Sequence, residues 1–290
     1  MRLVPGAGPA RVRLVGAGLG SETYRVERGD ESFSLRVAAR ADSRDAFDPL
    51  WEYRVRELAG SAGLAPAVLH ADAAAGIMLA RWVEGRTWSA AEACEPARVA
   101  QVALLVRRIH ALTPPRPARR VAPAEWIARY EMPYAGMRRA AANFDALRAE
   151  AVRRIEALAR LPAAAVLCHS DLHRLNVVET PSALVALDWE YAHVTDPLWD
   201  LAGWSSVNDF GAAMSGDLLR GYLGRRWLPA EWARFRHLAW LYDYVCLIWS
   251  EVYLARHADR IGADELARAQ HLAARLESDL GGSAGEVPAD

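Results

Sequence analysis

A short polar segment framed by apolar runs constrains this chain more than any other feature. The apolar run 166–168 leads into residues 169–176, whose pattern is H-x-D-x-x-x-x-N, and a second apolar run begins at Val177. A third apolar run, over 183–187, ends in Asp188. Short apolar runs bounded by polar residues are typical of buried strands. The pattern therefore predicts a strand, a polar loop, a second strand and an acid, in that order.

The polar residues of this segment match a phosphoryl-transfer site in type, order and spacing. In such a site one Asp accepts the proton of the attacking hydroxyl, while an Asn and a second Asp hold the Mg²⁺ that neutralises the phosphates. The sequence therefore predicts Asp171 as the catalytic base and Asn176 and Asp188 as metal ligands, with ATP as the phosphoryl donor.

Three other interpretations of the segment are less well supported. Asp and Asn favour turns even where they have no function. His169 and His173 are four residues apart, as on a metal-binding helix, but no Glu follows His169 and the flanking runs indicate strands. Cys168 could be a nucleophile, but a lone Cys at the end of an apolar run is more often a small buried hydrophobe.

Composition excludes several classes of protein. A chain of 290 residues with 52% hydrophobic and 24% charged residues is globular and long enough for two lobes. Its net charge of −1 supplies no basic field for nucleic acid. The three cysteines are far apart and the start carries no signal peptide, so we expect a cytoplasmic protein. The most apolar segment, 240–255, contains two acids and predicts a buried helix rather than a membrane span.

The absence of lysine restricts how the chain binds phosphate. All 35 basic residues are arginine. Any phosphate-binding cation must therefore be a guanidinium, which is planar and can bind two phosphate oxygens at once.

The first 84 residues contain the features of a nucleotide-binding lobe. Alternating residues predict strands at 11–15, 23–27, 32–37, 67–70 and 77–83. The glycine-rich stretch between the first two strands predicts a hairpin loop over phosphates, with Gly18, Gly20 and Ser21 as candidate ligands. Arg36 is a charge within the apolar third strand, so it is either an exposed residue or a phosphate ligand; after a glycine-rich loop we favour the ligand.

A helix should follow the third strand. Asp48 precedes Pro49 as an N-cap would, and Gly60 marks the end. A kinase places on this helix the Glu that orients its basic phosphate ligand. We expect Glu52 in this position, with Glu57 as the alternative.

The rest of the chain is predicted to be mainly helical. A turn at 84–85 places the lobe boundary, which gives a nucleotide-binding lobe over 1–84 and a larger lobe over 85–280, with a disordered tail over 281–290. Apart from the strands around the polar segment, apolar spacing predicts helices at roughly 95–112, 136–160, 197–209, 212–224, 229–257 and 262–278.

The whole pattern resembles the aminoglycoside phosphotransferase and choline kinase family, a branch of the protein-kinase-like fold. The most specific matches are His169–His173 with Asn176, the stretch 187–192 and the stretch 196–202. The resemblance implies an α+β fold with two lobes: a small antiparallel sheet with one helix, then a mainly helical lobe. It places Arg36 where relatives have a phosphate-binding Lys, and it implies that Trp82, Val83 and Glu84 form the hinge beside adenine.

Two departures from the family pattern concern the substrate. Leu175 stands where many relatives have a Gly before the metal-binding Asn, and 205–209 contains no counterpart of the Glu that choline kinases use for the cationic head group. The form of 188–191 resembles choline and thiamine kinases more than aminoglycoside-resistance enzymes.

The acceptor should be a small hydroxylated molecule. Only seven residues separate Asp188 from Asp196, where a helix can start, so there is no room for a peptide-docking segment. We expect a choline- or thiamine-like amino alcohol. The alternatives are an aminoglycoside, another sugar or a nucleoside as acceptor and, in another class of protein, a nucleotide-binding pseudokinase without turnover.

Aromatic rings and carboxylates attract an ammonium group, although an aromatic helix face can equally be part of the core, with Asp243 paired to an Arg. The candidate acceptor residues are His173, Glu190, Asp209, Trp240, Asp243 and Tyr244. No nucleic acid or membrane partner is expected, and the oligomeric state stays open.

Overall fold

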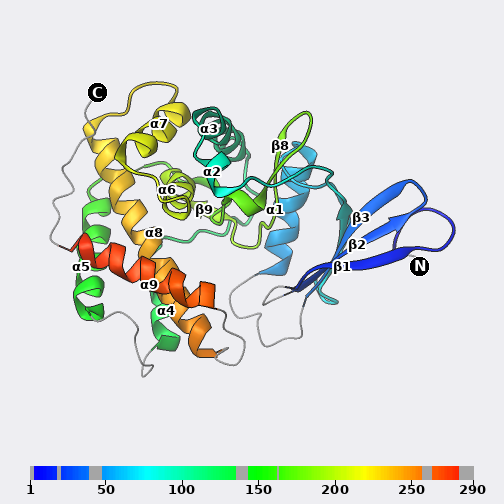
Figure 1. Cartoon of the computed structure of the whole chain (residues 1–290), viewed down its shortest axis with the longest axis horizontal. Coiled ribbons are helices and arrows are strands. Elements are labelled where there is room, and N and C mark those ends of the chain that lie inside the picture. Colours follow the sequence, from blue (N-terminus) through cyan, green and yellow to red (C-terminus); the bar gives the residue numbers. More distant parts are fainter. Residues whose placement is uncertain are drawn as a thin grey trace.

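The chain forms an antiparallel sheet followed by a mostly helical body (Figure 1). The computed structural model describes residues 3–17, 21–38, 48–134, 143–161, 163–256 and 263–280. The predicted glycine ligands Gly18 and Gly20 and the predicted disordered tail lie outside these residues. The expected α+β architecture is confirmed.

The sheet contains five strands in the order β1-β2-β3-β5-β4. Its own core is small and consists of Val26, Phe33 and Leu79, with a few half-buried neighbours. Arg36 lies on the central strand β3, opposite Thr23 of β2 and Met78 of β5. The strands are β1 (Arg11–Ala17), β2 (Ser21–Arg28), β3 (Glu31–Ala38), β4 (Val68–Asp72) and β5 (Ile77–Arg81).

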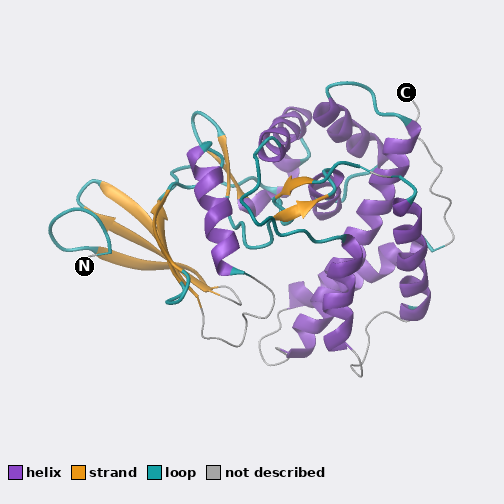
Figure 2. Cartoon of the chain, turned by 180° about the vertical axis from the view of Figure 1, so that it is seen from behind, coloured by secondary structure: helices purple, strands orange, loops and turns teal. Residues whose placement is uncertain are grey.

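Helix α1 (Pro49–Ser61) lies between the sheet and the helical body (Figure 2). The predicted N-cap is confirmed, because the Asp48 carboxylate accepts hydrogen bonds from the amides of Leu50 and Trp51 at 3.0 and 3.2 Å. The helix packs its apolar face into the large core of the helical body, and Trp51 Nε1 donates to the Ala192 carbonyl at 2.7 Å.

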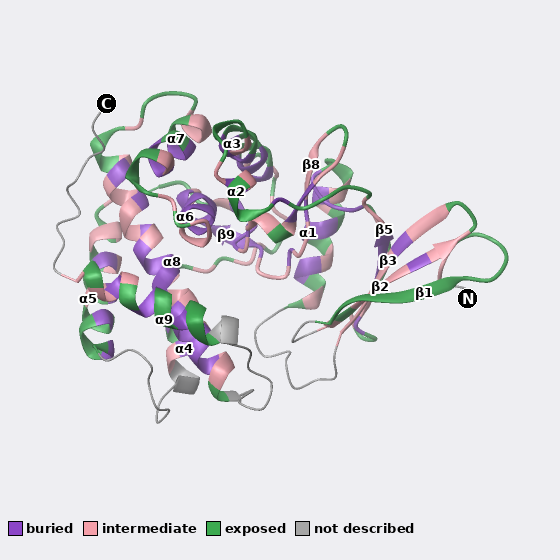
Figure 3. Ribbon diagram, viewed as in Figure 1, coloured by how far each residue is buried: buried purple, intermediate pink, exposed green. Residues whose placement is uncertain are grey.

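Helices α6 (Leu198–Val207) and α8 (Pro229–Arg256) pack against each other in the helical body, and many of their residues are buried (Figure 3). One of them, α8, is 28 residues long and covers the predicted buried segment 240–255. Among the described helices, none combines the length and the apolar character that crossing a membrane requires. The elements are α2 (Ala90–Ala93), α3 (Pro96–His110), α4 (Pro123–Tyr134), α5 (Phe144–Ala159), β6 (Val166–Cys168), the 3-10 turn η2 (Arg174–Asn176), β7 (Val177–Glu179), β8 (Leu184–Ala186), β9 (His193–Thr195), α6 (Leu198–Val207), α7 (Ala212–Leu223), α8 (Pro229–Arg256) and α9 (Ala263–Ser278).

The sequence prediction was wrong in part of this body. The predicted helix 136–160 overlaps α5, and its residues 136–142 lie outside the described residues, whereas α4 was not predicted at all. Strand β9 was also missed. It is three residues long and pairs with β6, so its pattern is too short to identify without its partner.

The chain leaves the sheet through Gly85, which crosses very close to strand β7. The neighbouring residues Arg86 and Glu179 exchange backbone hydrogen bonds of 3.1 and 2.8 Å. A Cβ at position 85 would lie 2.3 Å from the Glu179 carbonyl oxygen, so only glycine fits. This crossing follows directly on the predicted lobe boundary, which itself stays a prediction.

Candidate active site

The polar loop 169–176 lies between strands β6 and β7, as predicted. Within it the Asn176 amide donates to the Asp171 carboxylate at 3.2 Å and to the Asp171 carbonyl at 3.0 Å. The Asp171 side chain keeps 31% of its surface accessible, so a substrate can reach it. Burial by the surrounding protein and the charge of Asp188 raise the pKa of Asp171 to about 7. The structure therefore brings the three predicted catalytic and metal-binding residues together.

His169 connects this loop to the segment that carries Asp188. The imidazole is fully buried, and burial lowers its pKa, so the ring is neutral. Its Nδ1 accepts from the Asp171 amide at 3.4 Å, which places the proton on Nε2, and Nε2 donates to the Leu187 carbonyl at 2.7 Å. The His169 ring thus fixes the distance between the backbone of Asp171 and that of Leu187, the residue before Asp188.

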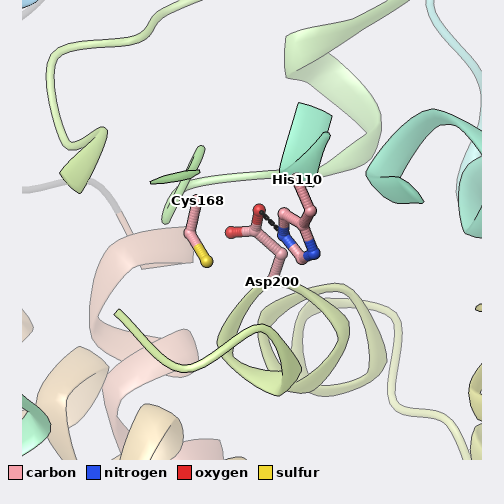
Figure 4. Close-up of side chains that lie close together, drawn as sticks. All are labelled: His110, Cys168 and Asp200. Atoms are coloured by element: carbon pink, nitrogen blue, oxygen red, sulfur yellow. Dashed lines mark hydrogen bonds and ion pairs between the residues drawn. The ribbon is translucent and has the colours of Figure 1, made fainter. Parts of the chain in front are cut away.

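Asp200 of α6 lies beside His110 and Cys168 (Figure 4) and hydrogen-bonds the start of the loop. Its carboxylate accepts from the amides of His169 and Ser170 at 2.9 and 2.7 Å, and it contacts His110 Nε2 of α3 at 3.1 Å. Tyr222 of α7 contacts the other nitrogen of His110 at 3.0 Å. Ser170 has a left-handed backbone with φ of 69°, a conformation that costs a non-glycine residue roughly 1–2 kcal/mol. The two amide bonds hold that conformation in place.

His110, Cys168 and Asp200 form a compact cluster whose ligand atoms lie within 4.8 Å of one another. The Asp200 oxygens already accept three hydrogen bonds, and Cys168 Sγ points to the Asp196 carbonyl at 3.4 Å. Burial raises the pKa of the Cys168 thiol well above its usual value, so it stays protonated and is a poor metal ligand. The cluster positions the loop by hydrogen bonding.

Arg36 lies where the sheet faces this loop. It forms a two-pronged ion pair with Glu52 of α1, at 2.7 and 3.0 Å, and Glu52 is buried. The same guanidinium reaches Asp188 and Glu190, each at 3.4 Å. The alternative acid, Glu57, is exposed on α1. The predicted contact between Arg36 and an early acid of the helix is therefore present, and Glu52 supplies it.

Glu190 lies in the same group of charges. Burial, followed by the charge of Asp188, raises the pKa of Glu190 to about 8. Asp188 itself has a positive φ of 57° and an exposed fraction of 47% at its side chain. The carboxylates of Asp171, Asp188 and Glu190 thus lie close enough for their charges to act on one another, and Arg36 contacts two of them, Asp188 and Glu190.

Three of the remaining nucleotide candidates, residues 82–84, directly follow strand β5. Trp82 donates its amide to the Ser32 carbonyl at 3.0 Å, and the Arg25 guanidinium lies over its ring, 4.8 Å from the centroid. Glu84 is exposed and forms an ion pair with Arg25 at 2.7 Å. Val83 is half-buried between them, and Ser21 begins strand β2.

Four of the six predicted acceptor residues have contacts with groups other than Asp171. Trp240 and Tyr244 are buried and stacked at 5.6 Å in the large core, and Tyr244 donates to Glu131 at 2.9 Å. Asp243 pairs with Arg275 at 2.6 Å, so the alternative of core packing with an Arg partner describes this helix face. The exposed Asp209 also pairs with Arg275.

His173, in contrast, is a neighbour of the base. Its Nδ1 accepts from the Leu175 amide at 3.3 Å, and its Nε2 lies 3.8 Å from the Asp171 carboxylate. Burial lowers the pKa of His173 to about 4, so the ring is neutral and presents an N–H toward Asp171.

Three tyrosines beside Asp171 escaped the sequence analysis. Tyr130 of α4 hydrogen-bonds Tyr191. Burial first, and then the charge of Asp171 among other groups, raises the pKa of the phenols of Tyr130, Tyr191 and Tyr242. Trp126 stacks on Tyr130 at 5.8 Å. Tyr191 is three residues after Asp188, so the sequence could have indicated that it lies near the site. Tyr130 could not, because α4 has no signal that links it to the loop.

Comparison with known proteins agrees with this geometry. A family model described as the phosphotransferase enzyme family matches residues 11–238. Among curated protein sequences there is no significant match. A solved structure of a choline/ethanolamine kinase family protein from Mesorhizobium loti is 27% identical with a TM-score of 0.77, over 93% of this chain and 87% of that one.

Two further structures share the fold at lower identity. Choline kinase LicA from Streptococcus pneumoniae has a TM-score of 0.76 at 23% identity, over 92% of this chain and 93% of its own, and a second structure of LicA holds AMP. The spectinomycin phosphotransferase APH(9)-Ia, in complex with ADP and spectinomycin, has a TM-score of 0.60 at 14% identity, over 92% and 93% of the two chains. The kinase-like, two-lobed fold is therefore confirmed. Because the family model spans most of the sequence, the chain belongs to the phosphotransferase enzyme family and is a phosphotransferase that acts on a small molecule.

Proposed function

We propose that the chain transfers the γ-phosphoryl group of ATP to a hydroxyl group of a small molecule, with Mg²⁺ as the metal. The observation that carries this proposal is the meeting of two groups of residues. Arg36, fixed by Glu52, reaches Asp188 from the sheet, while Asp171 and Asn176 face Asp188 from the loop. Phosphoryl transfer depends mainly on positioning and on charge stabilisation, and this arrangement supplies both.

Asp171 acts as the base in this proposal. A carboxylate whose pKa of about 7 is near the working pH combines a useful ionised fraction with useful basicity. In the reaction a carboxylate oxygen of Asp171 accepts the proton of the acceptor hydroxyl while the hydroxyl oxygen forms a bond to the γ-phosphorus, and the bond from the γ-phosphorus to the bridging oxygen breaks to release ADP. Asn176, His169 and Asp200 position the base for this step.

The donor groups at the site fit Mg²⁺. Asp188 offers carboxylate oxygens, and Asn176 uses its amide nitrogen on Asp171, which leaves its carbonyl oxygen as a ligand. Oxygen donors of this kind are those that Mg²⁺ prefers. When bound, the ion would neutralise charge on the phosphates. It would also offset the mutual repulsion of Asp171 and Asp188, which raises the pKa of Asp171 here.

The nucleotide is proposed to lie between the sheet and the loop, with Arg36 on its phosphates and Trp82, Val83 and Glu84 beside adenine. The AMP bound in the LicA structure supports a nucleotide site in this fold. Arg36 is half-buried and already aligned by Glu52, so its guanidinium loses little freedom when it binds phosphate oxygens.

For the acceptor we propose an amino alcohol of the choline or thiamine type. The relative at 27% identity supports this class. The half-buried ring of Tyr191, three residues after Asp188, supplies an aromatic face near the catalytic loop, and such faces attract an ammonium group by roughly 0.5–2 kcal/mol. Glu190 adds a carboxylate on the same side of Asp188.

The test replaces Asp171 with asparagine and uses the exposed Asp217 of α7, changed to asparagine, as the control. ADP release is measured with Mg²⁺ and a panel of amino alcohols, sugars and aminoglycosides, and ATP binding is measured by calorimetry. We expect Asp171→Asn to lower kcat by about 10²-fold or more while ATP still binds. Turnover within a few-fold of the wild type would remove Asp171 from this role. ATP binding without ADP release in the wild type would indicate a pseudokinase instead.

A further inference from the structure

Helix α1 carries a second arginine that contacts the Glu52 carboxylate. Arg56 lies one turn after Glu52, is buried, and places its Nη1 3.4 Å from Oε1 of Glu52. The same oxygen accepts from Nη1 of Arg36 at 2.7 Å. One buried carboxylate therefore lies between two guanidinium groups, of which Arg36 belongs to the sheet and Arg56 to the helix that carries Glu52.

The charges of these three residues do not cancel. Glu52 carries one negative charge, whereas each arginine carries one positive charge. Arg36 has further partners in Asp188 and Glu190, at 3.4 Å each. Across the described residues Glu52 is the only acid that contacts Arg56, and the Arg56 Nε has no hydrogen-bond partner there. Arg56 thus depends on Glu52, and Glu52 divides its charge between two guanidinium groups.

The stability of the fold alone does not account for a guanidinium at this position. The neighbouring buried residues of α1, Trp51, Val55 and Ala59, belong to the large apolar core. Burying a charge carries a desolvation cost that a single contact at 3.4 Å offsets only in part. An apolar side chain of similar length would fill the same space without that cost, and Glu52 would keep its closer partner Arg36. What only the guanidinium supplies is a second positive charge beside Glu52.

We propose that Arg56 is a positioning residue for phosphate binding. It fixes the Glu52 carboxylate on α1 and takes up part of its negative charge, so that Arg36 keeps positive charge for the phosphates of the nucleotide. Arg56 acts through Glu52 and Arg36 rather than by contact with the nucleotide. This inference rests on the proposed function, since it assumes that Arg36 binds phosphates. Without Arg56, the whole charge of Glu52 would act on Arg36, and a phosphate would have to compete with a complete ion pair.

Substitutions of Arg56 test the proposal through ligands that differ in phosphate content. Arg56→Met removes the charge at similar length, and Arg56→Lys keeps it. The matched control is Arg154→Met, because Arg154 is also buried and also pairs with a glutamate four residues earlier, Glu150 of α5, at 2.7 Å. Calorimetry measures the binding of ATP and of adenosine in the presence of Mg²⁺, and urea unfolding shows that each variant is folded.

The expected effect is a loss of affinity that is confined to the ligand with phosphates. Arg56→Met should weaken the binding of ATP about 5- to 20-fold, as expected when part of a charge-assisted contact is lost, and should leave that of adenosine within about twofold. Arg56→Lys should retain most of the affinity for ATP, and Arg154→Met should change the binding of neither ligand.

A double substitution supplies the sharpest comparison. In an Arg36→Ala background, Arg56→Met should cause no further loss of ATP affinity, because Arg56 acts through Arg36 and effects within one network are not additive. Equal weakening of ATP and adenosine by Arg56→Met, an unchanged affinity for ATP, or a full additional loss in the Arg36→Ala background would overturn the proposal. If Arg56→Met does not fold, Arg56→Gln replaces it in the same comparisons, since it also removes the charge.

The failure of this inference can be told apart from the failure of the proposed function, because the binding measurements require no turnover. A loss confined to ATP in Arg56→Met, with no ADP release from the wild type on any acceptor, would support the positioning role and contradict phosphoryl transfer. ADP release by the wild type, with Arg56→Met binding ATP normally, would support the proposed function and contradict the positioning role.

Discussion

Replacing Asp200 with asparagine would remove one of the two oxygens that hold the backbone of the catalytic loop. In the wild type Oδ1 accepts from the Ser170 amide, and Oδ2 accepts from the His169 amide and contacts His110. An amide nitrogen cannot accept, so the asparagine loses least when its nitrogen faces Ser170. One buried N–H then has no partner, which costs about 1–3 kcal/mol, and the remaining contacts lose their charge assistance.

We therefore expect Asp200→Asn to lower the free energy of unfolding by about 2–4 kcal/mol, a large part of the 5–15 kcal/mol typical of a domain. Unfolding in urea, followed by tryptophan fluorescence, measures this change. The same substitution at Asp217, which is exposed and pairs only with Arg220, should change stability by less than about 0.5 kcal/mol.

Activity should fall along with stability, for a geometric reason. Ser170 holds its left-handed backbone next to Asp171, and without its bond to Asp200 the loop can relax and move the base. A shift of about 1 Å can cost 10²-fold in rate, so we expect kcat to fall about 10- to 100-fold with little change in the KM for ATP. Adding Ser170→Gly should recover part of the loss, because glycine adopts a positive φ without strain.

The pH dependence supplies a separate check. Burial raises the pKa of Asp200, but the hydrogen bonds and charges of His110 and His169 outweigh it and hold the pKa below its ordinary value. A carboxyl with a lowered folded-state pKa contributes stability above its unfolded-state pKa and loses that contribution as the pH falls through the folded value. The stability gap between wild type and Asp200→Asn should thus be full at neutral pH and narrow in acid. An asparagine variant as stable and as active as the wild type at pH 7 would refute the positioning role.

Three further substitutions test other contacts of the site. Arg36→Ala should weaken the binding of ATP more than that of adenosine in calorimetry, because only ATP carries phosphates; an equal loss for both would indicate a structural role. Trp51→Phe removes the hydrogen bond to the buried Ala192 carbonyl and should cost about 1–3 kcal/mol in urea unfolding, and an unchanged midpoint would show that the contact is dispensable. Gly85→Ala forces a Cβ against the Glu179 carbonyl oxygen and should destabilise the chain by several kcal/mol, on the order of other severe substitutions; a variant of wild-type stability would show that this crossing yields easily.

The catalytic loop could be predicted from sequence because its information is local. Short apolar runs on both sides of 169–176 form β6 and β7, and the polar residues between them converge on Asp171 and Asp188 as the spacing indicated. Helix α1 was equally predictable, since Asp48 and Pro49 mark its start through contacts within one turn.

The acceptor side could not be predicted, because its contacts join distant parts of the chain. An aromatic helix face with an acid looks the same whether it lines a site or fills a core. Only the structure shows that Asp243 is paired with Arg275, 32 residues later, and that Trp240 and Tyr244 are buried.

The ion pair between Arg36 and Glu52 joins two bodies that have separate cores. Arg36 belongs to the sheet, whose core is the small group around Phe33, whereas Glu52 belongs to α1, whose apolar face is part of the large core. Trp51 fixes that helix to Ala192, four residues after Asp188. Glu52 is therefore fixed in the same body as Asp188 and Glu190, whereas Arg36 belongs to the sheet. A movement of the sheet relative to α1 would stretch or tighten the contacts of Arg36 with Glu52, Asp188 and Glu190 together, so the position of the sheet determines whether the guanidinium stays beside Asp188.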